Sequence, residues 1–422
     1  MQATMIAPAA NLPPALAERL AAVARCGVMA PKVPGLGPLF SVMQPLPPPG
    51  GVPGPQAPPI AAPLALLGLL NRPEEAARRL LDLPGEALAR IRGGEGIVAF
   101  DGASEGRGFA PVHAQSLHAA LDAAGIPPGR AAWLQQNRRL RAPYEKYCAA
   151  QDIAPLRIVT ADSYGFGLWD RLAGRRPRGW RWGFALARDG ARRHRWICLN
   201  YMLRPHRALV ALWLMDRPEP GHLSISTTRQ AIDAPWRAGF LAAVARLAPE
   251  APDHAAARAA ALIDGGLHLG HDTDAFAHPQ ERVFSLPEAE VADAELFIVT
   301  ETEMAGTGLA RWTEKTLKAL ASGLPFIVFG NQGTIAGLEA LGFDLLRDLV
   351  DHGYDRLGDP AARFAAARGA VARFLDRPAG FSPAEMARLR EASARNRVVF
   401  GREMLRVSML DPLDAVIGML RG

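Results

Sequence analysis

The sequence has 422 residues, a length that predicts two or three domains and excludes a mini-protein. Hydrophobic residues make up 49% and charged residues 21%, which excludes a disordered chain and a charged fibrous protein. The net charge of +6 is a small excess for this length, so we expect no nucleic-acid partner. Three widely separated cysteines, Cys26, Cys148 and Cys198, predict neither a disulfide framework nor a zinc site and fit a reducing, cytoplasmic location.

Proline dominates the first 63 residues, which hold 15 of the 36 prolines in the sequence. Because proline interrupts helices and central strands, residues 1–63 predict a mostly extended arm. One short helix can form inside the arm, at 14–25, where Leu16, Leu20 and Val23 recur at helical spacing; the alternative is that the arm is a poorly ordered leader. The sequence has no apolar run of 18 residues and no charged segment before an apolar core at its start, so we expect neither a membrane span nor a secretion signal.

From residue 64 onward, helical patterns alternate with short apolar runs, which is typical of parallel sheets covered by helices. The first series predicts helices at 72–82, 85–92, 111–124 and 142–151 and strands at 96–100, 131–134 and 156–160. After an arginine-rich connection at 171–195, the second series predicts strands at 196–200, 222–226, 295–300 and 324–329 and helices at 205–215, 235–247, 314–322 and 334–341. We therefore expect an α/β protein with two Rossmann-like domains, 64–190 and 191–422, that face a cleft.

The expected strand at 295–300 ends in Glu301 and Thr302, and ligands of parallel α/β sheets bind beyond the carboxyl ends of the strands. The helix that follows has Thr313 as its expected N-cap and Glu314 and Lys315 in its first turn, where free N–H groups favour a phosphate. Lysine adds positive charge, and a carboxylate can accept from two ribose hydroxyls. The segment therefore suits a nucleoside diphosphate sugar. The alternative is ordinary charge complementation at a helix end.

A second candidate segment begins with Asn200, at the end of the expected strand 196–200. Arg204 and Arg207 flank the start of the next helix, where two guanidinium groups can bind a phosphate but are repelled by the helix dipole. Their position predicts an anion site. The alternative is that they pair with acidic side chains such as Asp272 and Asp274.

These two segments together resemble the donor-binding half of the α-1,3-fucosyltransferases, which are GT-B enzymes that use GDP-fucose. The resemblance covers residues 195–360 and rests on Asn200, Arg204, Arg207, the run Phe297–Thr302, Thr313–Lys315, Ala319, Gly323, Pro325 and Gly330. A further stretch, Pro325–Phe343 with Asp351–Asp355, resembles uncharacterised bacterial and phage proteins of glycosyltransferase type.

The resemblance to the fucosyltransferases implies roles for individual residues. It implies that Glu314 contacts the ribose, that Lys315 and Arg207 contact the diphosphate, and that Glu301 lies near the sugar. Thr302 belongs to the same donor-binding set, although it and Glu303 stand where that family usually has Asn and Ser.

An inverting sugar transfer needs a base that takes the proton of the acceptor hydroxyl. The Gly-rich turn after the strand at 96–100 offers Glu105 as the first candidate and Asp101 as the second. The alternative is that Asp101 only satisfies backbone N–H groups of the turn. His113 could cap the next helix or bind a ligand.

The sequence does not predict a metal site. His268, His271, Asp272, Asp274 and His278 lie close together, but their spacing matches no helical metal motif, and Asp272-Thr273-Asp274 is a weak signal for a metal-assisted sugar nucleotide site. We expect no cofactor and no divalent metal, with the nucleotide-sugar as substrate.

The motifs of other enzyme classes are missing, because no Walker loop, GxSxG turn or GxGxxG loop follows any expected strand. We therefore expect a cytoplasmic glycosyltransferase that moves a sugar from a nucleotide-sugar donor to a glycan or related acceptor. The alternative is a non-catalytic glycan- or phage-associated binding protein on the same scaffold.

Overall fold

The structure is a computed structural model that describes residues 13–25, 60–65, 72–103, 106–172, 183–185, 187, 189–270, 283–304 and 306–421. The chain divides into two compact units, each built around its own sheet. The first unit comprises Met1–Pro177, Gly308–Arg311 and Arg402–Gly422, and the second comprises Arg178–Thr307 and Trp312–Gly401. The expected α/β class with parallel sheets is confirmed.

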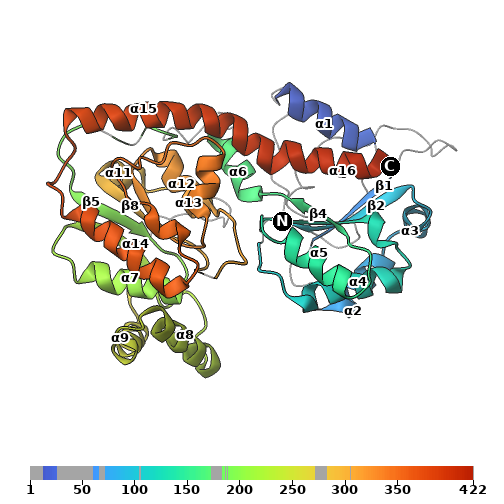
Figure 1. Ribbon diagram of the computed structural model, residues 1–422, viewed down its shortest axis with the longest axis horizontal. Helices are drawn as coiled ribbons and strands as arrows, with labels where there is room; N and C mark the ends of the chain where they lie inside the picture. Colours follow the sequence, from blue (N-terminus) through green and yellow to red (C-terminus); the bar gives the residue numbers. More distant parts are fainter. Residues whose placement is uncertain are drawn as a thin grey trace. The chain divides into compact units, whose positions relative to one another are not determined.

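The sheet of the first unit has four parallel strands in the order β1-β2-β3-β4 (Figure 1). The strands are β1 (Ile60–Ala65), β2 (Gly96–Gly102), β3 (Ala131–Gln135) and β4 (Arg157–Thr160). Strand β1 begins inside the region expected to be an extended arm, and Ile60 pairs with Gly96. Pro63 is tolerated there because β1 is the edge strand, where one row of N–H groups has no ladder partner.

The helices of the first unit follow from this strand order. Because the spatial order equals the chain order, right-handed connections put the crossover helices on one face of the sheet. These helices are α2 (Pro73–Leu81), α3 (Gly85–Arg92), α4 (Pro111–Ala124) and α5 (Arg141–Ala150), and α6 (Ser163–Leu172) follows β4. Leu80, Ile91, Phe100, Leu117 and Trp133 are buried in the core between helices and sheet. Gly125, at φ +63°, ends α4 in the left-handed conformation expected of a C-cap.

Two terminal helices pack together in the first unit. The expected helix at 14–25 is confirmed as α1 (Pro14–Arg25), and it contacts α16 (Asp411–Arg421) near the C-terminus (Figure 1). Leu16 is fully buried, and Arg19 makes two hydrogen bonds of 2.8 Å to the carboxylate of Asp414. Helix α16 lies in the first unit, although the sequence alone assigned all of 191–422 to the second domain.

The sheet of the second unit has the order β7-β6-β5-β8-β9. Its strands are β5 (His194–Leu199), β6 (Gly221–Ser226), β8 (Ala294–Thr300) and β9 (Phe326–Phe329), all parallel, and β7 (His268–Leu269), which is antiparallel to β6. The chain enters at β5, adds β6 on one side and later returns to add β8 on the other side. The strand order therefore reverses between β5 and β8, and such a switch point leaves a crevice at the carboxyl ends of the strands.

Helices α7 (Pro205–Met215) and α12 (Glu314–Ser322) follow β5 and β8 and cover opposite faces of this sheet (Figure 1). The described part of this unit also contains the helices α8 (Ala234–Leu247), α9 (Pro252–Asp264), α11 (Glu288–Ala292), α13 (Thr334–Ala340), α14 (Pro360–Leu375) and α15 (Pro383–Val399). Two π-helical turns, Phe400–Met404 and Arg406–Leu410, continue the chain from α15 to α16. Every strand and helix expected from the two alternating series is present within two residues of its expected ends.

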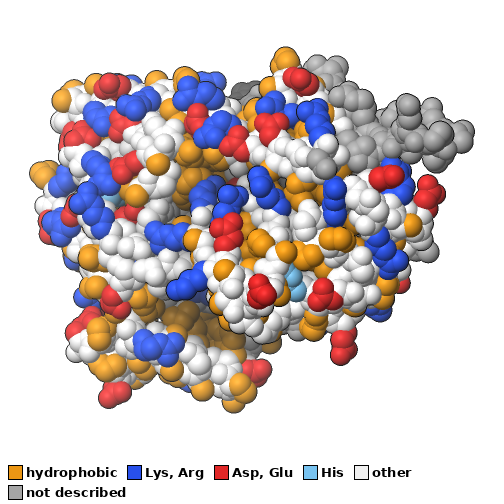
Figure 2. Space-filling model, turned by 45° about the vertical axis from the view of Figure 1, so that its right-hand side comes forward, with side chains coloured by type: hydrophobic (Ala, Val, Ile, Leu, Met, Phe, Trp, Pro, Cys, Tyr) orange, Lys and Arg blue, Asp and Glu red, His pale blue; other side chains and the backbone are white. Residues whose placement is uncertain are grey.

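Charged side chains of both signs are interspersed over the face shown in Figure 2, with hydrophobic side chains between them. Many of the arginines are paired with acids, for example Arg237 with Asp264 and Arg258 with Asp216. Among the described helices, none combines the length and apolarity needed to cross a membrane.

Candidate functional site

Asn200 and Glu301 directly follow the neighbouring strands β5 and β8, at the switch point of the second sheet. The side chain of Asn200 is buried, and its Oδ1 accepts a hydrogen bond from the hydroxyl of Thr300. Its backbone N–H donates to the carbonyl oxygen of Ser224 at 3.0 Å. Asn200 thus connects the carboxyl ends of β5, β6 and β8.

The carboxylate of Glu301 connects β8 to the start of α12. It accepts hydrogen bonds from the hydroxyls of Thr313 and Thr316, both at 2.5 Å, and from the backbone N–H of Thr313 at 3.2 Å. Glu301 is 2% exposed, and both of its carboxylate oxygens are engaged inside the protein. A Cβ at Gly330 would lie 2.9 Å from Glu301 Cγ, so glycine is required for this close approach. The contact with a sugar that the resemblance implied for Glu301 stays a prediction.

The first turn of α7 and its N-cap carry two arginines and a histidine. Arg204 is the N-cap, Pro205, His206 and Arg207 follow it, and the turn contains no acidic residue. Arg207 is buried and donates to the backbone oxygens of Glu301, at 2.9 and 3.2 Å, and Met202, at 2.8 Å. These bonds use three of the five N–H groups of its guanidinium.

Charges of both signs surround this helix end: the carboxylates of Glu314 and Glu301 act on Arg207, and Glu303 and Asp359 line the pocket together with Arg204. Burial, together with Arg207, Arg204 and Lys315, lowers the pKa of His206 to about 3. Burial and Arg204 also lower the pKa of Arg207, to about 10. The Nε atom of Arg204 is buried, and no hydrogen-bond partner for it exists in the described part of the chain. A bound anion would relieve this repulsion and would also be favoured by the dipole of α7.

The start of α12 lies beside the same strand end. Thr313 is the N-cap, as expected, and its hydroxyl accepts from the N–H of Lys315 at 3.3 Å. The Lys315 ammonium donates to the carboxylate of Glu314 and to the hydroxyl of Thr302, the latter at 3.4 Å. Burial alone would raise the pKa of Glu314, but Lys315 and Lys318 outweigh it and hold that pKa below its usual range. Glu314 is therefore a charged partner of Lys315.

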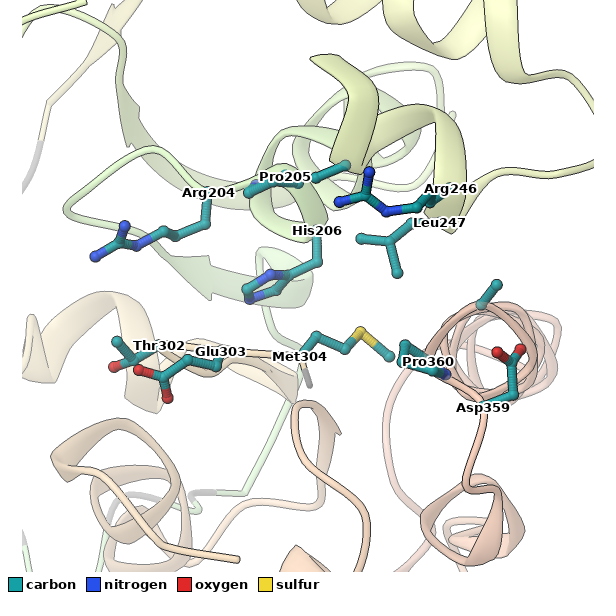
Figure 3. Close-up of a pocket in the computed structure, with 12 residues that line it drawn as sticks. Arg204, Pro205, His206, Arg246, Leu247, Thr302, Glu303, Met304, Asp359 and Pro360 are labelled. Atoms are coloured by element: carbon teal, nitrogen blue, oxygen red, sulfur yellow. The ribbon is translucent and has the colours of Figure 1, made fainter. Parts of the chain in front are cut away.

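A pocket of about 580 Å³ opens beside these residues, within the range of small-molecule sites. Figure 3 shows that its two sides come from different elements. One side is formed by the start of α7 and the end of α8, and the other by the segment after β8 and the start of α14. Of the residues singled out from the sequence for donor binding, Arg204 and Thr302 line this pocket.

Several pocket residues were not found from the sequence. They are His206, Arg246, Leu247, Met304, Asp359 and Pro360, which supply both charged and apolar walls (Figure 3). Asp359 caps α14, and its carboxylate accepts from the N–H of Ala362 at 2.8 Å. An Asp followed by Pro at the start of a helix is a recognisable N-cap signal, so Asp359 could have been found. Arg246 lies near the C-terminal end of α8, and the residues around it in the sequence form no motif that would indicate a binding site.

In the first unit, Asp101 is the second-to-last residue of β2 and is 2% exposed. Its carboxylate accepts from the N–H of Ala103 at 3.0 Å, which is the contact expected if Asp101 stabilises the turn. Glu105, the first candidate for the base, lies outside the described residues, so its role stays a prediction. His113 is buried in the first turn of α4, and burial together with Arg107 lowers its pKa.

The remaining sequence signals have structural explanations or lie outside the described residues. Tyr354 accepts from the N–H of Val328 at 2.9 Å, and the carboxylate of Asp355 accepts from the N–H groups of Ile335 and Ala336. The run Asp351–Asp355 therefore connects β9 to α13. His271, Asp272, Asp274 and His278 are not among the described residues. In the ranges that are described, no three His, Cys, Asp or Glu side chains are grouped so that they could hold a metal ion.

Comparisons with protein-family models, with curated proteins and with solved structures found no match.

Proposed function

We propose that the second unit binds a nucleoside diphosphate sugar and that the protein is a GT-B-type glycosyltransferase, which transfers the sugar to a glycan or related acceptor. One observation supports this most strongly. The first turns of α7 and α12, with Arg204, Arg207 and Lys315, lie at the carboxyl ends of the adjacent strands β5 and β8, where the strand order reverses, and a 580 Å³ pocket opens at Arg204.

The diphosphate would lie at the start of α7, where the buried Nε of Arg204 lacks a partner among the described residues. Lys315 is connected to the pocket through the hydroxyl of Thr302, which lines it. Hydrogen bonds to charged groups contribute about 1.5–3 kcal/mol each, so these cations can account for substantial affinity. The apolar side chains of Leu247, Met304 and Pro360 would then contact the less polar part of the ligand.

In the transfer step, the acceptor hydroxyl oxygen forms a bond to the anomeric carbon of the sugar while the bond from that carbon to the diphosphate breaks. The hydroxyl proton passes to a base, for which Glu105 remains the first candidate. The diphosphate leaves with additional negative charge, which Arg204 and Lys315 are suited to stabilise. A cytoplasmic location belongs to the same proposal and agrees with the free, buried thiols of Cys148 and Cys198.

The Arg204 side chain provides the test of this site. We expect Arg204→Ala to weaken binding of GDP or UDP at least tenfold in calorimetric titrations at low salt, because a charge-assisted phosphate contact is lost. Arg258→Ala is the matched control, since it also removes one guanidinium but one that pairs with Asp216 on the surface. Equal affinity of the Arg204→Ala and Arg258→Ala variants would refute the assignment of Arg204.

The alternative is a non-catalytic binding protein, and one observation favours it: Glu301 and Glu314 are engaged with neighbouring side chains, as expected of a scaffold. Turnover distinguishes the two functions. A glycosyltransferase releases a nucleoside diphosphate from its sugar nucleotide when acceptor is supplied, whereas a binding protein retains glycan affinity without this release.

A further inference from the structure

The segment between β8 and α12 does not remain in the second unit throughout. Residues 308–311 belong to the first unit, whereas the residues on either side, Thr307 and Trp312, belong to the second. This four-residue segment lies between Thr302, which lines the pocket, and Thr313, which caps α12. Its anchorage in the first unit therefore constrains a connection that carries candidate donor-binding residues at both ends.

Asn137, which follows β3, anchors this segment. Its Nδ2 donates to the backbone oxygens of Gly308, at 2.9 Å, and Arg107, at 2.8 Å. Its Oδ1 accepts from the backbone N–H groups of Ala310, at 2.9 Å, and Arg139, at 3.0 Å. An amide side chain has two N–H groups to donate and two lone pairs to accept with, so Asn137 uses its full hydrogen-bonding capacity here. Asn137 is fully buried, with no part of it exposed to solvent.

A second contact holds the same segment. The guanidinium of Arg311 donates to Gln136 Oε1 at 3.1 Å, and both side chains are buried. A Cβ at Gly106 would lie 2.6 Å from Arg311 Cδ, so the aliphatic part of Arg311 packs directly against the backbone of Gly106. The backbone N–H of Arg138 adds a hydrogen bond of 2.9 Å to the carbonyl oxygen of Ala310.

We propose that Asn137 is a positioning residue of the sugar-donor site, an inference that rests on the proposed function. Arg311 precedes Thr313 by two residues, and Thr313 both caps α12 and binds the carboxylate of Glu301. Only Trp312 and Thr313 separate residues 308–311 from the first turn of α12, which carries Lys315, so loss of the anchor would lengthen the unanchored connection before that turn. Without the anchor, ordering this turn around a phosphate would cost additional conformational entropy.

The test compares Asn137→Ala with Asn396→Ala in the full-length chain. Asn396 is a matched control because it is also buried and also bridges backbone groups, accepting from the N–H and donating to the carbonyl oxygen of Asp344, both at 2.7 Å. Without ligand, we expect amide hydrogen exchange across residues 306–316 to accelerate at least tenfold in Asn137→Ala and to stay unchanged in Asn396→Ala. We expect GDP or UDP affinity to fall at least fivefold in Asn137→Ala only.

Asn137→Asp serves as the conservative variant and keeps the acceptor for Ala310, so we expect an intermediate loss of affinity. If Asn137→Ala does not fold, Arg311→Ala is measured in its place, with the same expected direction in exchange and affinity. Unchanged exchange in 306–316, or faster exchange with full nucleotide affinity, overturns the positioning role while leaving the proposed function intact. Absence of GDP and UDP binding by the unaltered protein overturns the proposed function, and the positioning role with it.

Discussion

His206 is held neutral in the first turn of α7. Its Nε2 lies 2.8 Å from the backbone oxygen of Glu301, which can only accept, so Nε2 carries the proton and Nδ1 is left as an acceptor. Burial and three neighbouring cations lower the pKa of this imidazole to about 3, so it does not take up a proton between pH 5 and 8. His206 is therefore suited to accept a hydrogen bond from a ligand hydroxyl, and not to supply charge.

This low pKa has a consequence for stability. Between pH 6.5 and 3 the unfolded chain binds a proton at His206 and the folded chain does not, so His206 destabilises the fold as the pH falls, by at most about 1.4 kcal/mol per pH unit. His206→Gln keeps an N–H group for Glu301 but cannot titrate. We expect the melting temperature of the unaltered protein to fall more between pH 7 and pH 5 than the melting temperature of the His206→Gln variant. An equal fall in the melting temperature of both proteins would contradict the low pKa of His206 in the folded protein.

Glu314 has two possible partners, the adjacent Lys315 and the ribose of a sugar nucleotide. Glu314→Gln removes the negative charge but leaves an amide that accepts more weakly. If Glu314 binds the ribose, we expect GDP or UDP affinity to fall about threefold or more while affinity for pyrophosphate, which has no ribose, stays equal or rises. Titration of both ligands checks this. A parallel fall in the two affinities would show that Glu314 acts only through Lys315.

At the scale of single elements, the close approach of β9 to β8 depends on Gly330. We expect Gly330→Ala to lower the stability of the fold by about 1–3 kcal/mol, because the new Cβ would be forced against Glu301 Cγ. Gly239→Ala, in α8, is the matched control: no atom lies within 4 Å of its added Cβ, and alanine favours a helix by about 1 kcal/mol. Chemical denaturation measures the free energy of unfolding of both variants. An equal change in the two variants would contradict a steric clash between the new Cβ at position 330 and Glu301.

Apolar periodicity predicted the helices at 205–215 and 314–322 and the strands before them, because these elements bury long apolar side chains. Strand β1 was missed, since Pro63 and its proline-rich surroundings indicate an arm, and only pairing with β2 makes it a strand. Helix α15 was missed for another reason. Its buried positions recur at helical spacing, but Ala392, Ser393 and Asn396 occupy three of them, so no apolar stripe is visible in the sequence.

The candidate site was predictable only where it follows a strand. Thr302 and Arg204 follow β8 and β5, and strand ends can be located from apolar runs. Arg246 and Asp359 reach the same pocket from α8 and α14, far away in the chain, and only the folded sheet and helices bring them together. The hydrogen bonds that Glu301 and Arg207 make within the protein could not be predicted from the sequence either, because they depend on where α7 and α12 meet the strand ends.

At the scale of the whole molecule, each unit contains chain from both halves of the sequence, since residues 308–311 and 402–422 belong to the first unit. A single boundary near residue 190 therefore does not describe the units. The proposed sugar-donor site nevertheless belongs to the second unit alone, because the pocket and the first turns of α7 and α12 lie within it.

Calorimetric titration of the full-length protein with GDP, UDP and CMP tests this claim most directly. We expect one equivalent of GDP or UDP to bind, with an affinity that weakens as salt is added because phosphate contacts with Arg204 and Lys315 are screened. CMP, with a single phosphate, should bind more weakly. Absence of binding by all three nucleotides at low salt would contradict the assignment of a sugar-donor site to the second unit.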